Sequence, residues 1–113
     1  MEEKMRDVET IAEELRQMNG DIGLVSRKIE LCFELMTSYC QKKKGKRFWF
    51  LSWGYFIERS HCVYAAKVLG NMQHKDLALG KRALKFTEEF EKELPSKVTK
   101  NLFFVAHKMN KPN

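Results

Sequence analysis

The sequence predicts an all-α protein, a compact bundle of four or five helices that folds as a single domain over residues 1–113. Apolar residues recur at helical spacing along most of the chain, and only two prolines and six glycines interrupt them. Hydrophobic residues make up 43% of the chain and charged residues 32%, a balance too apolar for a disordered chain and too charged for a membrane span. A chain of this length buries about 65% of its unfolded surface, which is enough for one core.

The first forty residues carry a heptad pattern in which ten apolar or semi-apolar positions alternate three and four apart. Such a repeat keeps one stripe of a helix facing a neighbour. Asn19-Gly20 suits a helix C-terminus and Asp21 suits the N-cap of a new helix. We therefore predict two helices, over about 2–19 and 21–43. A single long, kinked helix is the alternative.

The heptad stripe has two interpretations that use the same residues. It is either the seam of an intramolecular bundle or a coiled-coil surface offered to another chain. In the second case the candidate partner-helix face consists of the first six positions of the stripe: Val8, Ile11, Leu15, Met18, Ile22 and Val25.

Three more helices are predicted after these two heptad-patterned helices, which together form the N-terminal arm. The segment 48–70 has six aromatic residues in its first ten positions and is apolar nearly all round, so we expect a buried central helix. The segment 75–94 is plainly amphipathic and ends at Pro95-Ser96. A last amphipathic helix is predicted from Ser96 to about Lys108.

Charge is unevenly distributed along a chain of net charge +6. The first twenty residues hold six acids and three cations, whereas residues 41–47 hold five cations and no acid. Residues 95–113 hold four lysines and no acid. We therefore predict a basic loop over about 41–47 and a basic C-terminal tail over about 107–113.

The basic loop lies next to aromatic residues, a combination that predicts a patch for nucleic acid or another anionic surface. Cations neutralise phosphates, and aromatic rings stack on unpaired bases. The same run also fits a nuclear-import signal or attraction to anionic lipid, and a solvated loop that only caps a helix is the alternative. The candidate residues are Lys42, Lys43, Lys44, Lys46, Arg47 and Trp49.

The sequence contains no enzyme signature, and we predict no catalytic residues, no metal site and no cofactor. The three cysteines and three histidines lack the close pairs of a zinc site, and the glycines are too isolated for a phosphate-binding loop. An odd number of cysteines cannot form a complete disulfide set. With neither a secretory signal nor an apolar stretch of membrane-spanning length, we expect an intracellular protein, cytoplasmic or nuclear.

The expected function is therefore non-catalytic: a small interaction or adaptor module that binds a partner protein or itself through an amphipathic helical face. Nucleic-acid binding through the Lys42–Arg47 patch is the alternative. We expect neither a small-molecule substrate nor a membrane surface as the partner.

Overall fold

Five helices make up the part of this protein that the structure describes. The computed structural model describes residues 6–18, 20, 23–45, 51–72 and 76–110. The helices in these segments are α1 (Val8–Met18), α2 (Val25–Gly45), α3 (Trp53–Gly70), α4 (Leu77–Glu89) and α5 (Ser96–Asn110), and no strand occurs among the described residues. The predicted all-α class is confirmed, and of the predicted four or five helices the described residues form five.

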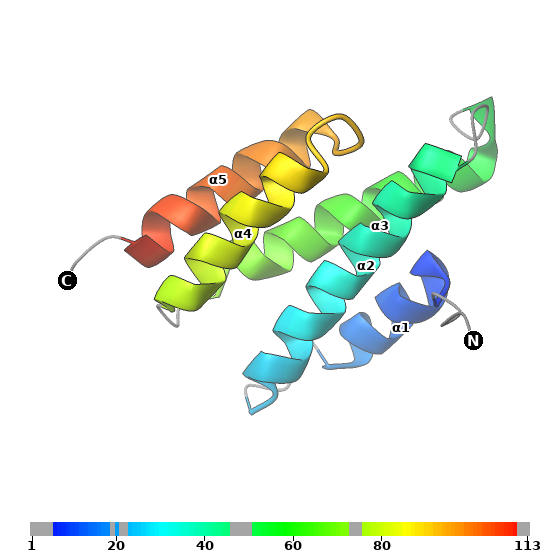
Figure 1. The fold of residues 1–113 in the computed structure, drawn as a ribbon. Helices are drawn as coiled ribbons and strands as arrows, with labels where there is room; N and C mark the ends of the chain where they lie inside the picture. The colour runs from blue at the N-terminus through cyan, green and yellow to red at the C-terminus, as the bar shows by residue number, and fades with distance from the viewer. Residues whose placement is uncertain (1–5, 19, 21–22, 46–50, 73–75, 111–113) are drawn as a thin grey trace, which may run out of the picture.

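The helices pack in three layers with α2 and α3 in the middle. Helix α3 contacts α1, α2 and α5, while α2 also packs against α1, and α4 pairs with α5. Figure 1 shows α1 on one side of the middle layer and the α4–α5 pair on the other. Helix α3 is therefore the central helix, as its apolar composition predicted.

One hydrophobic core runs through all five helices. Each helix places an apolar stripe at i, i+3 and i+4 spacing toward it, the arrangement that buries most surface in a bundle. The large side chains with no exposed surface are Ile11, Leu15, Leu31, Leu35, Met36, Tyr39, Leu69 and Leu102.

The predicted division of the N-terminal arm into two helices is confirmed, with α1 ending at Met18 and α2 starting at Val25. The predicted loop over 41–47 is wrong for its described part, because residues 41–45 form the last turn of α2. Cations stabilise a helix C-terminus, and the tertiary contacts of this turn with α3 and the α4–α5 connection hold it in helical form.

Helix α3 starts later than predicted, at Trp53, where the Ser52 side chain accepts a hydrogen bond from the Tyr55 N–H at 3.2 Å. Residues 48–50 of the predicted 48–70 helix lie outside the described residues. Helix α4 is capped in the same way by Asp76, whose Oδ1 accepts from the Ala78 N–H at 2.9 Å. It ends at Glu89, and residues 90–94, predicted as helix, form turns instead.

Candidate interaction surface

The basic end of α2 is tied into the fold by two of its lysines. Lys42 Nζ lies 2.8 Å from Glu58 Oε1, a carboxylate of α3 whose side chain is only 8% exposed. Lys43 Nζ donates to the Glu93 carbonyl at 3.1 Å and lies 6.0 Å from the Tyr55 ring centroid. Both ammonium groups therefore have partners within the chain, so fewer of their N–H donors are available to bind a phosphate.

Lys44 is the third member of the predicted anionic-surface patch that the structure describes. Lys44 is exposed and lies 5.6 Å from the Phe90 ring centroid. Lys46, Arg47 and Trp49 lie outside the described residues. The described part of the patch therefore consists of one exposed and two half-buried lysines.

Most of the described positions of the predicted partner-helix face lie inside the bundle. Val8, Ile11 and Leu15 have no exposed surface, and Met18 packs partly buried against the same core. Val25 is half-buried, and Ile22 lies outside the described residues. At its buried positions this face is therefore not a free surface, which favours the intramolecular seam.

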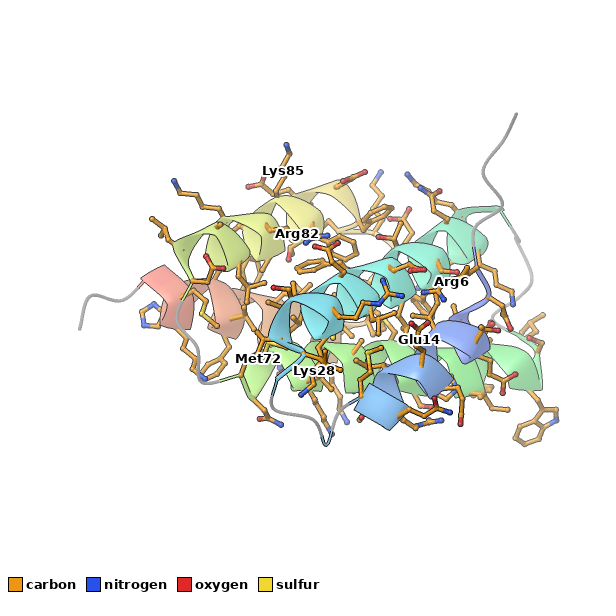
Figure 2. The ribbon with its side chains drawn as sticks, turned by 90° about the horizontal axis from the view of Figure 1, so that it is seen from below. Arg6, Glu14, Lys28, Met72, Arg82 and Lys85 are labelled. Atoms are coloured by element: carbon orange, nitrogen blue, oxygen red, sulfur yellow. The ribbon has the colours of Figure 1, made fainter. Side chains whose placement is uncertain are left out.

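Arg6 fixes the start of α1 to α2. Its Nε and Nη2 donate to the two Glu34 carboxylate oxygens at 2.6 and 2.8 Å, and its Nη1 donates to Glu14 at 2.6 Å. Arg27 donates to the other Glu14 oxygen at 2.7 Å. Hydrogen bonds from Arg27 and Arg6 lower the pKa of Glu14. Figure 2 shows Arg6 beside Glu14, on the side where α1 meets α2.

The first turns of α3 expose a cluster of large apolar side chains, which we call the α3 aromatic cluster. Trp53 is 86% exposed, Phe56 58% and Ile57 49%, and Leu51 just before the helix is 71% exposed. The Trp53 and Phe56 ring centroids lie 6.4 Å apart, and Ile57 lies one helical turn after Trp53, so these three side chains share one surface of α3. The sequence predicted a buried helix here and did not reveal this surface. An apolar composition does not show which turns of a helix extend beyond the helices packed against it.

An open hollow of about 640 Å³ lies beside this cluster, between α1 and α3. We call it the acidic hollow, because carboxylates dominate its charged lining. Its walls include Ile57 of the α3 aromatic cluster. The other lining residues are Asp7, Glu9, Thr10, Glu13, Glu14, Arg16, Gln17 and His61.

His61 closes the acidic hollow on the α3 side. It is buried, and its Nδ1 lies 3.0 Å from Arg16 Nη2, so the neutral ring accepts the guanidinium N–H. Burial, and then the charge of Arg16, lower the pKa of His61 because both disfavour the imidazolium.

We therefore expect stability to fall on acidification. A lowered folded-state pKa means that the contribution of His61 is fully present above the unfolded-state value of about 6.5 and is lost as the pH falls through the folded-state value. Urea unfolding between about pH 7.5 and 5 measures this loss. His61→Gln, which keeps an acceptor for Arg16 but does not titrate there, should give a flatter profile. Parallel profiles for the two proteins would contradict the assignment.

The three cysteines are buried free thiols. Burial raises the pKa of Cys32 and of Cys40 to about 12, and it raises the pKa of Cys62 well above its usual range. These side chains act as small core hydrophobes. Among the residues that the structure describes, no group of three His, Cys, Asp or Glu side chains is placed to hold a metal ion.

The class defined by this fold and surface is a small helical bundle with an exposed apolar and acidic face. Comparison of the chain with models of protein families, with curated proteins and with solved structures finds no match. Within the described segments, no helix is long and apolar enough to cross a membrane.

Proposed function

We propose that this protein is a non-catalytic interaction module that binds a partner protein through the α3 aromatic cluster and the acidic hollow. The exposure of Trp53, Phe56 and Ile57 on one continuous surface carries this proposal. Contiguous exposed apolar surface marks interaction sites in soluble proteins, and Trp anchors are frequent hot spots of binding energy. Burying each of these side chains against a partner contributes about 1.5–3 kcal/mol.

The charge around the cluster indicates the kind of protein partner. Asp7 and Glu9 border the acidic hollow and form no ion pair within the described residues. Exposed carboxylates of this kind repel nucleic acid and anionic lipid and attract cationic side chains. A basic amphipathic helix offers apolar residues to the cluster and cations to the hollow, so we infer that the partner presents one.

Titration with a synthetic Lys/Leu amphipathic helical peptide tests this proposal. In a Trp49→Phe background, Trp53 fluorescence should shift to the blue and saturate as the peptide binds. Phe56→Ser should weaken binding about 10-fold or more, since a buried aromatic contributes at least about 1.4 kcal/mol. Leu77→Ser is the matched control, because Leu77 is 54% exposed on α4 and should leave binding unchanged. Absence of binding, or an equal loss in both variants, would refute the proposal.

Nucleic-acid binding is the second candidate function, and the position of Lys43 and Lys44 supports it. Lys43 lies over the Tyr55 ring, which in turn contacts Phe56, so the basic end of α2 adjoins the α3 aromatic cluster. Fluorescence anisotropy with labelled single-stranded RNA tests it. This function requires affinity that falls roughly a hundredfold between about 50 and 200 mM salt. The internal engagement of Lys42 and Lys43 makes it the weaker candidate.

A further inference from the structure

The outer face of α5 has a composition that complements the acidic hollow and the α3 aromatic cluster. Lys97, Lys100, Phe103, Phe104 and His107 are all exposed on this helix, with Phe103 at 50% and Phe104 at 56%. Its opposite face places Val98, Leu102 and Val105 in the core. The helix therefore has one buried aliphatic face and one exposed face that is both basic and aromatic.

Two exposed lysines of α5, Lys97 and Lys100, are available to an acidic surface. The helix contains no acidic residue, and neither Lys97 nor Lys100 forms an ion pair with another residue that the structure describes. Lys108 differs, because its Nζ donates to the Met72 carbonyl at 2.6 Å and so fixes the end of α3. The cationic part of the α5 face therefore consists of Lys97 and Lys100.

The two complementary surfaces lie on different sides of the molecule. Helix α1, which carries three of the four acids of the hollow and directly follows the fourth, Asp7, packs against α2 and α3. Helix α5 packs against α3 and α4. Figure 1 shows α1 and α5 separated by the middle layer. Because α5 is held by its own core residues, it cannot turn its outer face into the hollow of the same molecule.

We propose that a second copy of this chain occupies the acidic hollow, inserting the outer face of its α5. Lys97 and Lys100 of one copy meet Asp7, Glu9 and Glu13 of the next, and Phe103 and Phe104 pack on the α3 aromatic cluster. This inference rests on the proposed function and names the partner. Because the two surfaces differ, the contact is head-to-tail. One copy of a pair keeps a free α5 face and the other a free acidic hollow, so the assembly can extend at both ends.

The assembly is tested with two variants of the full chain, each of which disables one surface. Variant A, Phe56→Ser with Glu13→Gln, changes only the receiving surface. Variant B, Phe104→Ser with Lys100→Gln, changes only the inserting surface. All four positions lie at the surface, so circular dichroism should confirm an unchanged helical fold for both variants.

Sedimentation velocity over a range of concentrations gives the readout. The wild-type mass should rise with concentration, and A and B should each stay monomeric. An equimolar mixture of A and B should form a 1:1 complex and nothing larger, because the intact α5 of A fits the intact hollow of B. A monomeric mixture, or self-association of either variant alone, would overturn the proposal.

The test separates this inference from the proposed function. A monomeric wild type that still binds the Lys/Leu peptide would refute self-association and leave the protein-binding proposal in place. Monomeric wild type that binds single-stranded RNA, with the binding lost in B, would assign the α5 face to nucleic acid and also refute self-association.

Discussion

Replacing Leu15 by aspartate is expected to unfold most of the protein. Leu15 has no exposed surface and lies in the core on α1. The change removes a buried leucine, which costs about 2–5 kcal/mol, and adds a carboxyl group with no polar partner at that depth. A domain of this kind has a total stability of about 5–15 kcal/mol, so little of it would remain.

Urea unfolding followed by circular dichroism measures this loss, and it also decides between the two interpretations of the heptad stripe. The control is Gln17→Asp, an exposed position on the same helix that should change stability by no more than about 0.5 kcal/mol. If Leu15→Asp kept wild-type stability, the stripe would have to be a surface for another chain.

Periodicity was sufficient to predict the helices, because each of them buries one stripe and the spacing of that stripe is visible in the sequence. The break between α1 and α2 was also predictable, since Asn19-Gly20 interrupts a pattern that otherwise continues in phase. Whether the stripe faces its own chain or another could not be predicted. The same apolar positions serve both arrangements, and only the burial of Ile11 and Leu15 against α2 and α3 separates them.

The interaction surface was harder to predict, because it depends on how far each helix extends past its neighbours. Phe56 and Cys62 belong to the same apolar helix, yet Phe56 is exposed and Cys62 is fully buried. Composition treats both as core residues. The outer face of α5 was hard to predict for a related reason: Phe103 and Phe104 are exposed, whereas their neighbours Leu102 and Val105 are fully buried.

For the basic residues of 41–47, the sequence likewise did not show which charged side chains have partners within the fold. Five cations near aromatic residues predicted a solvated patch, but a lysine beside a carboxylate of another helix has a structural partner that lies sixteen residues away in the sequence. Sequence spacing does not reveal this pair, because Lys42 and Glu58 belong to different helices and the sequence does not show how those helices pack together.

Removing the charge of Lys42 is expected to destabilise the protein by about 1–3 kcal/mol, a range that allows for the partial exposure of the lysine. Lys42→Met leaves the Glu58 carboxylate, 8% exposed, without the ammonium group at 2.8 Å. Lys44→Met is the matched control on the same helix turn. It also removes a cation from the C-terminus of α2, but Lys44 is exposed and forms no ion pair with the residues described, so its loss should be smaller.

The double variant Lys42→Met/Glu58→Leu shows whether the loss of stability comes from the Glu58 carboxylate that Lys42→Met leaves without its ammonium partner. With both charges replaced by apolar side chains, most of the stability should return, because a buried ion pair contributes little over a well-packed apolar pair. Urea unfolding of the four proteins gives the coupling energy directly. The same variants address the second candidate function. A Lys42→Met protein of wild-type stability whose RNA affinity is lost would assign Lys42 to phosphate binding, whereas reduced stability restored by Glu58→Leu assigns it to the fold.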